Sequence, residues 1–593
     1  DGNVSTIAGA VNMTAVNVVG GDGFTSASNA AGDNGGTSAT TMAVTADITT
    51  YQIAGGIGQL GLANNANGDS GDGGAATGTN TGALTATTVN VAGGVGGAGG
   101  ASTSAASGDG GAGGAATLDL NVATGTTQAI TTLNISGGNG GDGGDSSSNG
   151  NAGGAAGVGG NALATIAGDF TGDINLNDGT DGSAGTGTSG GTGGAAGTGG
   201  TATVTFDGTT AQTITGSISA AADGEGTIVM TADSSATADI VTITGAVGSS
   251  SASIGTITSG VTTAQTGSKF DSDVYADTIT HGLNQDWTGD NAMTMDFDGD
   301  VTFTTMTVTG GSANNGEDAI VTAAKNLTGT TINLNDGTNG NTILTLDGST
   351  AQTVSANIVA GTAGAGTVNI NNDATFTGTL AATNRLAALT VATDKTLTLS
   401  GAKTIGATAF NVNGAGGLTL TDTISLTAST TLDLSNGGTA TLTLDPTTKF
   451  ANDTVINADT GGATVNLSNN LTVIPPSNFT SGTLTLVDID ANDGTVNNNV
   501  ANISITNNAL ATYAASAASG TADVIITATK ASSASIASTL GVTGGAANAV
   551  SEAAGALSNV TSSTDQAILN AFNTAITAGG AQAKNAAQTV NVS

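Results

Sequence analysis

Short segments of the chain alternate apolar and polar residues with a period of two, and they recur as far as about residue 530. Clear examples are residues 366–380 (GTVNINNDATFTGTL), 439–450 (TATLTLDPTTKF) and 463–474 (ATVNLSNNLTVI). This period places Val, Leu, Ile and Phe on one strand face and Thr, Asn and Asp on the other. Asn/Gly turns, rather than helical intervals, separate the segments. The pattern therefore predicts an all-β fold, a right-handed parallel β-helix.

Glycine-rich blocks follow several of these strands. Gly20, Gly55, Gly93 and Gly137 each open a Gly-Gly pair after an apolar-x-apolar segment, namely VNVV, YQIA, VNVA and LNIS. The junctions are 35, 38 and 44 residues apart. Unequal spacing indicates a constant strand unit that carries insertions of variable length.

A second repeat supports the same organisation. Residues 176–182 (LNDGTDG) and 334–340 (LNDGTNG) are near-copies, and each precedes a second near-copy, at 205–213 (TFDGTTAQT) and 345–353 (TLDGSTAQT). The Asp-Gly dipeptides of the two near-copies, at Asp178 and Asp207, lie 29 residues apart in the first repeat. Those at Asp336 and Asp347 lie 11 residues apart in the second, a difference of 18 residues. That difference is the length of residues 183–200, so we expect a glycine-rich loop extruded between two strands.

The glycine blocks have an internal form that predicts an ordered excursion. Residues 93–114 run GGVGGAGG, then ASTSAAS, then GDGGAGG, and residues 137–160 repeat the plan. We interpret each block as an outgoing limb, a small polar tip and a returning limb. Runs with glycine at two of every three positions can stack as extended threefold helices, because no side chain separates the chains. The alternative is a flexible linker.

The C-terminal segment differs from the rest. From about residue 531 the chain is rich in Ala and Ser. Residues 563–566 (STDQ) fit a capping box, and Ile568, Leu569, Phe572 and Ile576 form an apolar helical stripe. This pattern predicts a helical cap on the solenoid. We therefore expect three regions: residues 1–200 with glycine insertions, 201–530 rich in strands, and 531–593 partly helical.

Composition narrows the possible functions. The 593 residues include 8 Lys plus Arg against 44 Asp plus Glu, a formal net charge of −36, and the first basic residue is Lys269. This balance opposes binding to nucleic acid and to anionic lipid, and it favours solubility and divalent cations. There is no cysteine, so disulfides and thiolate metal sites are excluded. We expect no transmembrane helix, and we interpret Asp1 as the start of a processed, mature product.

The C-terminal part resembles a known family. Residues 482–488 (GTLTLVD), then 502–530 (NISITNNALATYAASAASGTADVIITATK), then the helical residues 566–593, are similar in order to the end of an autotransporter passenger. The resemblance implies a β-helical passenger cleaved from its outer-membrane barrel and located outside a Gram-negative cell. Some large passengers of this type form surface layers, and others are adhesins.

Alternate carboxylates suggest one candidate cation site. Asp296, Asp298 and Asp300 lie in the segment DFDGD, where alternate residues of a strand project to one face. A hard cation such as Ca²⁺ prefers clustered oxygen ligands. An ordinary solvated turn is the alternative.

A second candidate site lies in DIDANDG, where Asp488, Asp490 and Asp493 resemble the start of a calcium loop. Asp493 stands where such a loop has glycine, and Asn499 stands where it has glutamate. These departures argue against an EF-hand. The acids of the glycine blocks could bridge neighbouring molecules through cations, or could act as solubilising charge: Asp22, Asp69, Asp72, Asp109, Asp142 and Asp145.

The sequence gives little indication of a catalytic site. His281 is the only histidine, with Trp287 nearby, and we expect both to pack locally. No nucleophile-elbow motif surrounds any serine, and the basic residues are scattered. We therefore expect a structural cell-surface protein that assembles into a homo-oligomeric layer on the cell envelope, with Ca²⁺ as a possible ligand. The alternatives are an adhesin and an ice- or carbohydrate-binding solenoid that uses its outward Thr and Asn rows.

Overall fold

In the computed structural model the chain forms a parallel β-helix, as the sequence predicted. The structure describes residues 3–556 except for short gaps, at 9–10, 25–31, 44, 64–67, 123–125, 148, 189, 232–238, 261–265, 283–291, 312–317, 339, 446–449, 451–452, 468–469, 477–478, 490–493, 499, 508–509, 518–522 and 541–543. It separates into two compact units, Asp1–Val321 with Gly337–Gly340, and Thr322–Asp336 with Asn341–Ser593.

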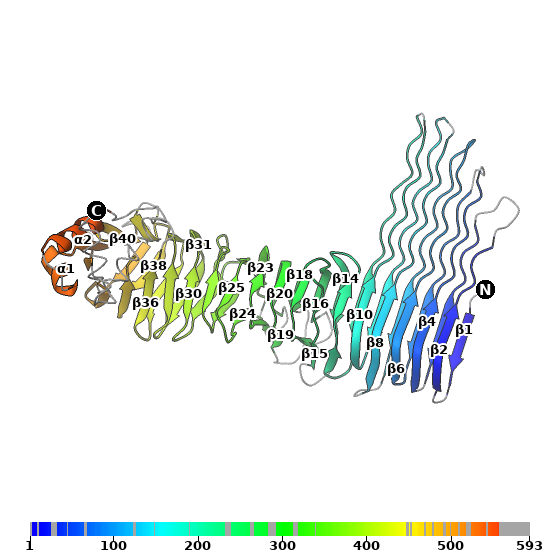
Figure 1. Ribbon diagram of the computed structural model, residues 1–593, viewed down its shortest axis with the longest axis horizontal. Helices are drawn as coiled ribbons and strands as arrows, with labels where there is room; N and C mark the ends of the chain where they lie inside the picture. Colours follow the sequence, from blue (N-terminus) through cyan, green and yellow to red (C-terminus); the bar gives the residue numbers. More distant parts are fainter. Residues whose placement is uncertain are drawn as a thin grey trace. The chain divides into compact units, whose positions relative to one another are not determined.

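Unit 1 winds its strands into two parallel ladders. Figure 1 shows the glycine-rich limbs leaving the strands of the first 200 residues on one side of this unit. One ladder contains β1 (Asn3–Ile7), β3 (Ser38–Met42), β5 (Ala76–Asn80), β7 (Ala116–Leu120), β9 (Ala162–Ile166), β11 (Ala202–Phe206), β14 (Glu225–Met230), β16 (Ile254–Ser259), β18 (Val274–Gly282) and β20 (Val301–Thr309). The other contains β2 (Val11–Val19), β4 (Ala46–Ala54), β6 (Leu84–Ala92), β8 (Thr127–Ser136), β10 (Asp169–Asn177), β12 (Gln212–Thr215), β13 (Ile218–Ala220), β15 (Asp239–Ile243), β17 (Thr266–Phe270) and β19 (Met293–Phe297).

The core of unit 1 is built from rows of side chains in register. Val16, Tyr51, Val89, Leu133 and Ile174 occupy equivalent positions on successive strands, and all five are buried. Most residues alternate between this interior and the outside, as in β6, where Leu84, Ala86, Val89 and Val91 are buried and the alternation shifts by one residue at Thr87 and Thr88. The predicted period of two therefore sets which residues enter the core.

Unit 2 continues the parallel winding with mostly shorter strands and includes a third sheet. Phe410 lies in register with Leu389 and Leu432 in a fully buried row. The strands are β22 (Leu327–Thr328), β23 (Thr331–Asn335), β24 (Thr342–Leu346), β25 (Gln352–Val354), β26 (Asn357–Ala360), β27 (Thr367–Ile370), β28 (Ala374–Phe376), β29 (Leu386–Val391), β30 (Thr396–Leu399), β31 (Lys403–Ile405), β32 (Ala407–Asn413), β33 (Gly417–Leu420), β34 (Ile424–Leu426), β35 (Thr431–Asn436), β36 (Ala440–Leu444), β37 (Thr454–Asn457), β38 (Ala463–Leu467), β39 (Leu471–Ile474), β40 (Gly482–Asp488), β41 (Gly494–Asn498) and β42 (Ile503–Ile505). The sequence boundary between the units falls inside β21 (Ala319–Ala323).

The pairing changes direction near the end of unit 2. β43 (Ala511–Ala517) and β44 (Val524–Lys530) form an antiparallel pair, and β44 also pairs antiparallel with β40. The third sheet has the strand order β31-β34-β37-β40-β44-β43. Two helices follow, α1 (Ser533–Leu540) and α2 (Gly544–Ala556), and the Ser551 hydroxyl of α2 donates to the Ala531 carbonyl at 3.2 Å. The helix predicted around residues 563–576 lies outside the described residues.

Candidate interaction surface

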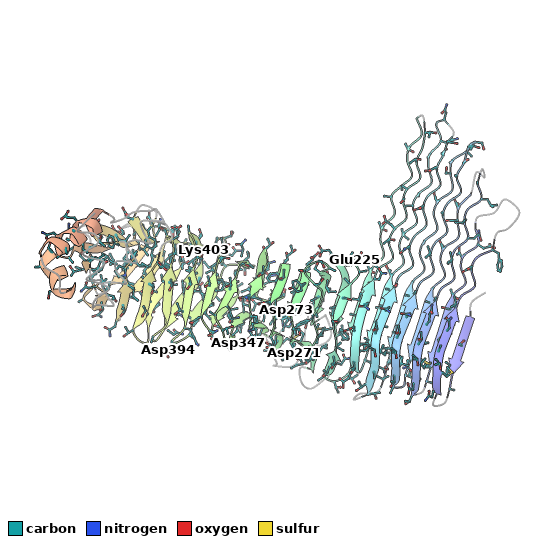
Figure 2. The ribbon with its side chains drawn as sticks, in the orientation of Figure 1. Glu225, Asp271, Asp273, Asp347, Asp394 and Lys403 are labelled. Carbon is teal, nitrogen blue, oxygen red and sulfur yellow. The ribbon has the colours of Figure 1, made fainter. Side chains whose placement is uncertain are left out.

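Five glycine-rich excursions leave unit 1 and stack into a layer two chains thick, which we call the glycine layer. Each excursion has an outgoing and a returning limb, as the sequence predicted. Figure 2 shows that these limbs carry far fewer side chains than the strand-rich rungs do. The outgoing and returning limbs are residues 20–24 and 32–37, 55–62 and 68–75, 93–100 and 107–115, 137–144 and 152–161, and 178–186 and 191–201.

The limbs are joined by backbone hydrogen bonds that repeat every third residue. Within the row of outgoing limbs, the N–H groups of Gly55, Gly58 and Gly61 donate to carbonyls of the next rung at 2.8–2.9 Å. The next residue of each triplet donates to the other row: Gly94 N–H donates to Gly74 O at 2.8 Å. A period of three matches an extended threefold helix. The glycine blocks are thus ordered and mutually bonded, and the linker alternative is wrong.

Steric crowding explains why glycine predominates at the first two positions of each triplet, although Gln59, Ser70 and Ala156 are exceptions. A Cβ atom on Gly93 would lie 1.8 Å from the carbonyl oxygen of Gly114, and one on Gly94 would lie 1.9 Å from that of Gly56. Neither approach is tolerable, because the obstacle is backbone. The third residue points away from the layer and carries a side chain, as at Ile57 and Val95. The prevalence of Gly-Gly-X triplets in these limbs follows from this packing.

The N–H group of a third residue has a side-chain acceptor where the preceding rung carries Asp or Asn at the equivalent position. Ala112 N–H donates to the Asp72 Oδ1 of the preceding rung at 2.8 Å, and Thr180 N–H donates to Asn139 Oδ1 at 3.1 Å. The backbone N–H of Thr186 lowers the pKa of Asp145. Every glycine-block acid named from the sequence takes part, with the pairs Asp22–Ile57, Asp69–Asp109, Asp72–Ala112, Asp109–Ala155, Asp142–Ser183 and Asp145–Thr186. These carboxylates are structural acceptors as well as surface charge.

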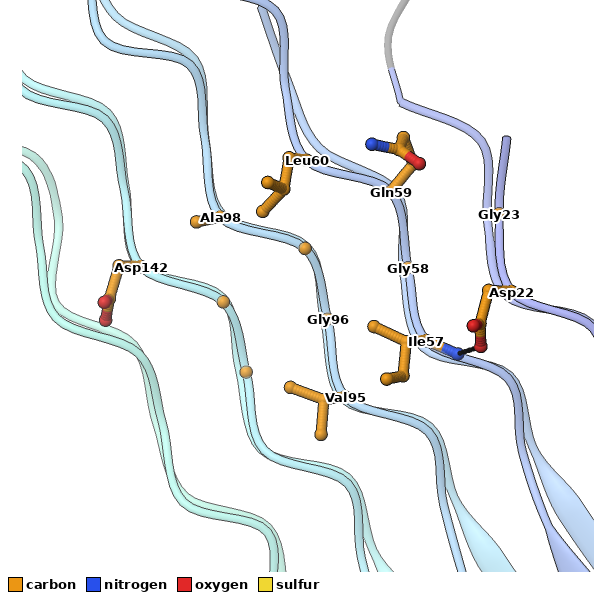
Figure 3. A pocket seen from close by; sticks show the side chains of 13 residues that line it. Asp22, Gly23, Ile57, Gly58, Gln59, Leu60, Val95, Gly96, Ala98 and Asp142 are labelled. Carbon is orange, nitrogen blue, oxygen red and sulfur yellow. Dashed lines mark hydrogen bonds between the residues drawn. The ribbon is translucent and has the colours of Figure 1, made fainter. Parts of the chain in front are cut away.

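The outer face of the outgoing row carries an exposed apolar strip. Ile57, Leu60 and Val95 are 51%, 59% and 40% exposed. They line a shallow groove of about 490 Å³ whose lining also includes Asp22 and Asp142 (Figure 3). The groove floor is glycine backbone, so a partner could approach closely. An apolar strip with carboxylates at its margins suits contact with another macromolecule better than small-molecule chemistry.

The structure brings two of the candidate calcium ligands together around a lysine. Lys269 Nζ lies 2.7 Å from Asp271 Oδ1 and 3.8 Å from Asp296 Oδ2, and it also pairs with Asp298. Hydrogen bonds from Lys269 to the Asp271 and Asp298 carboxylates raise the lysine pKa. The backbone N–H of Asp300 donates to Asp273 Oδ1 at 3.0 Å. The cation among these carboxylates is therefore a side chain of the protein.

The second candidate group is only partly visible. Asp488 ends β40, and its Oδ2 accepts a hydrogen bond from the Thr454 hydroxyl at 3.3 Å. Burial, and next the charge of Asp523, raise the Asp488 pKa. Asp490 and Asp493 lie outside the described residues. Among the residues that the structure describes, no group of three or more His, Asp or Glu side chains could hold a metal ion.

His281 is enclosed in the core of unit 1. It is 0% exposed, its Nε2 lies 3.1 Å from the Met293 carbonyl oxygen, and burial lowers its pKa to about 4. Local packing, as the sequence suggested, is the arrangement observed. Trp287 falls outside the described residues. In the described part of the chain, no helix is long and apolar enough to cross a membrane.

The structure shows three buried glutamines whose burial and hydrogen bonding the sequence pattern did not predict. Gln212 and Gln352 occupy the same place in the two AQT repeats: each Oε1 accepts the N–H of the glycine four residues earlier at 3.0 Å. Each Nε2 donates to two carbonyls at a corner of the preceding rung. Gln128 Oε1 accepts the Leu84 N–H at 2.9 Å. The repeated glutamine, flanked by small residues, was the available signal.

No protein-family model, curated protein or solved structure matches this chain. The likeness to autotransporter passengers therefore remains a resemblance in the order of elements. Function has to be argued from the glycine layer and its faces.

Proposed function

We propose that this protein is a structural, non-enzymatic component of a bacterial cell surface that assembles with copies of itself into a coat or surface layer. In this proposal the chain is an autotransporter-type passenger, secreted and held outside the outer membrane of a Gram-negative cell. The observation that carries the proposal is the exposed apolar strip on a rigid, hydrogen-bonded glycine layer. Such an exposed apolar surface lowers the solubility of the protein unless a partner covers it.

The layer is well suited to many weak, repeated contacts. Ile57 and Leu60 lie three residues apart on one limb, and Val95 and Ala98 repeat the spacing on the next rung. The limb backbones need little ordering on association, because they are already fixed by hydrogen bonds, so less conformational entropy is lost. Two copies that meet through this face would bury the strip in a regular contact.

Charge determines the conditions for assembly. A net charge of −36 makes two copies repel each other, and salt or divalent cations reduce that repulsion. Asp22 and Asp142 flank the apolar strip and would face acids of a second copy. We therefore propose Ca²⁺ as a ligand shared between molecules, acting together with screening by salt.

Electron microscopy of the protein and of the native envelope tests this proposal. Purified protein should form ordered sheets with Ca²⁺, and a chelator should release it from cells together with the visible coat. Ile57→Ser combined with Val95→Ser should prevent the sheets. Val158→Ser, a third-position change on the opposite face where Val158 is 44% exposed, is the control for general loss of apolar surface. Protein that stays monomeric with Ca²⁺ at high concentration contradicts the proposal.

An adhesin is the alternative within the same architecture. It predicts that deleting the protein abolishes attachment to cells or surfaces while any ordered coat remains. The same envelope images distinguish the two functions, because only the structural function requires a lattice.

A second candidate is recognition of ice or a neutral carbohydrate by outward hydroxyls. A groove of about 420 Å³ on the outer face of unit 1 favours it, and the lining includes the threonines Thr49, Thr85, Thr87, Thr131, Thr171 and Thr215. Thr85 and Thr171 occupy equivalent positions two strands apart, with Ala129 between them. Thermal hysteresis or glycan-array binding by the purified protein would favour this candidate over assembly.

A further inference from the structure

The glycine layer ends in an edge of backbone donors that nothing in the described chain covers. In the preceding returning limb, Gly153, Ala156 and Gly159 donate their N–H groups to the last limb at 2.8–3.0 Å. Their equivalents in the last limb are Gly193, Ala196 and Gly199, which we call the donor edge. Within the described residues these three N–H groups donate no hydrogen bond, and all three residues are exposed.

Two glycines on this edge have no steric reason to be glycine. A Cβ on Gly193 would lie 3.6 Å from the nearest atom, and one on Gly199 would lie 3.7 Å away. Inner glycines at the same position of the triplet behave differently, since a Cβ on Gly159 would lie 1.8 Å from the Gly179 carbonyl oxygen. Another chain lying close to this edge would leave no room for a Cβ at Gly193 and Gly199, just as neighbouring limbs leave no room for one inside the layer.

The opposite edge of the layer offers the complementary groups. The backbone carbonyl oxygens of Asp22 and Asn34 occupy the positions that Ile57 and Asp72 occupy on the next rung. The Ile57 and Asp72 oxygens accept hydrogen bonds within their row, but those of Asp22 and Asn34 accept none within the described residues. Gly21 on this edge has no atom within 4 Å of the place of a Cβ. Donors and open glycines on one edge thus match acceptors and an open glycine on the other.

We propose that the donor edge of one copy binds the limb of residues 20–24 of a second copy, so that the glycine layer continues across two molecules. This inference rests on the proposed self-assembly and names the surface that performs it. It is the same hydrogen-bonded contact that already joins successive limbs within one chain. Both chains remain extended threefold helices, and no side chain has to move.

Two features limit the geometry of this contact. β11 pairs with β9 and β14, so the ladder continues past the layer and a second solenoid cannot stack there in the same orientation. The second copy must approach with its limbs running in the opposite direction. The adjacent outgoing limb carries Asp178 and Asp181 at the equivalent positions, and charged side chains keep a sheet edge from pairing. The contact is therefore confined to the returning limb.

A matched pair of variants tests the donor edge. Ala196→Val places a branched side chain on the edge, while Ala195→Val places it on the outer face one residue earlier; both residues are exposed. Association is measured by sedimentation velocity over a range of concentrations in about 0.15 M salt with Ca²⁺. Wild type and Ala195→Val should associate equally. Ala196→Val should associate about tenfold more weakly, because backbone hydrogen bonds are lost, while melting as wild type does.

Hydrogen exchange gives an independent readout on the unaltered chain. The amides of residues 191–200 should gain protection when the wild-type protein assembles. If Ala196→Val assembles as wild type does, or if these amides stay unprotected in the assembly, the donor-edge contact is refuted and the surface function stands. If no copy associates under any condition, both proposals are refuted.

Discussion

Gly114 donates its backbone N–H to the carbonyl oxygen of Gly94 at 2.7 Å, and this bond joins the returning limb of one rung to its outgoing limb. Gly94 in turn donates to Gly74 of the preceding rung at 2.8 Å, so the bonds alternate between the two rows along the layer. The glycine layer is therefore cross-linked in two directions by backbone groups alone. Its rigidity, and with it any role in assembly, depends on chains that can approach this closely.

A single methyl group inside the layer should disrupt it. A Cβ on Gly114 would lie 2.1 Å from the Gly74 carbonyl oxygen, so Gly114→Ala must push two limbs apart. We expect a cost of about 1–3 kcal/mol, typical of an overpacked interior. Limited proteolysis of residues 93–161 measures the local loss. Gly193→Ala, at the open edge, is the control and should leave the cleavage rate unchanged; equal sensitivity of both variants would contradict the packing described.

The third-position carboxylates should act as hydrogen-bond acceptors rather than only as charges. Asp72→Ala leaves the Ala112 N–H without its acceptor, whereas Asp72→Asn keeps an oxygen in place at the 2.8 Å position while removing the charge. We expect the Ala112 amide to exchange about fivefold faster in Asp72→Ala than in the wild type, because one net hydrogen bond contributes about 1 kcal/mol. In Asp72→Asn the amide should exchange at a rate near that of the wild type. Similar rates in both variants would show that charge, not acceptance, matters.

The buried corner glutamine of unit 2 should contribute strongly to stability. Gln352→Ala removes three hydrogen bonds, to the Gly348 N–H and to the carbonyls of Ala323 and Lys325. Because these backbone groups would stay buried and unpaired, we expect a loss of about 2–4 kcal/mol. Denaturant unfolding measures the loss, with the exposed neighbour Thr353→Ala as the control. A loss no larger than that of the control would refute the corner role.

Acid should destabilise unit 1 through His281. Burial lowers the pKa of His281 to about 4, below its ordinary value of 6.5, so the folded protein holds the neutral imidazole. The unfolded chain takes up a proton below pH 6.5 and the folded chain does not. The stabilisation from His281 is therefore complete above pH 6.5 and declines by about 3 kcal/mol as the pH falls toward 4. A His281→Gln variant should lose this part of the pH dependence of unfolding; an unchanged profile would assign it to other groups.

Replacing Lys269 should convert its surroundings into a cation site. Lys269→Met leaves Asp271, Asp296 and Asp298 without their shared counter-charge, and clustered carboxylate oxygens are the ligands that Ca²⁺ prefers. We expect Ca²⁺ to raise the melting temperature of Lys269→Met more than that of the wild type, measured against Mg²⁺ as a control for ionic strength. A response of Lys269→Met no larger than that of the wild type would contradict this conversion.

Much of the fold could be predicted from the sequence because the β-helix is locally encoded. The period-two pattern in residues 463–474 predicts both the strand β38 and its buried Val465, and the Gly-Gly junctions predict where limbs leave the rungs. The out-and-back form of the blocks is confirmed because their two limbs bond to each other. Each inference needed only neighbouring residues and a repeat.

The bonding inside the site was harder to predict, because partners lie about 35–46 residues apart and belong to different rungs. Asp109 shows no local signal for an acceptor; its role appears only when its rung is aligned with the next at Ala155. Lys269 was likewise not connected with Asp296 and Asp298, since the contact depends on the register of β17 with β19. Aligning the glycine blocks by triplet would have revealed the first relationship.

Hydrogen exchange across the glycine limbs tests the central claim most directly. Peptides covering residues 93–115 and 137–161 should exchange as slowly as the neighbouring strands β6 and β8, because the first two amides of each inner triplet have backbone acceptors, and the third has a carboxylate acceptor where the preceding rung carries Asp, as at Ala112 and Ala155. Exchange in these peptides at the rate of an unstructured chain, with the strands still protected, would contradict an ordered glycine layer and remove the basis for assembly through it.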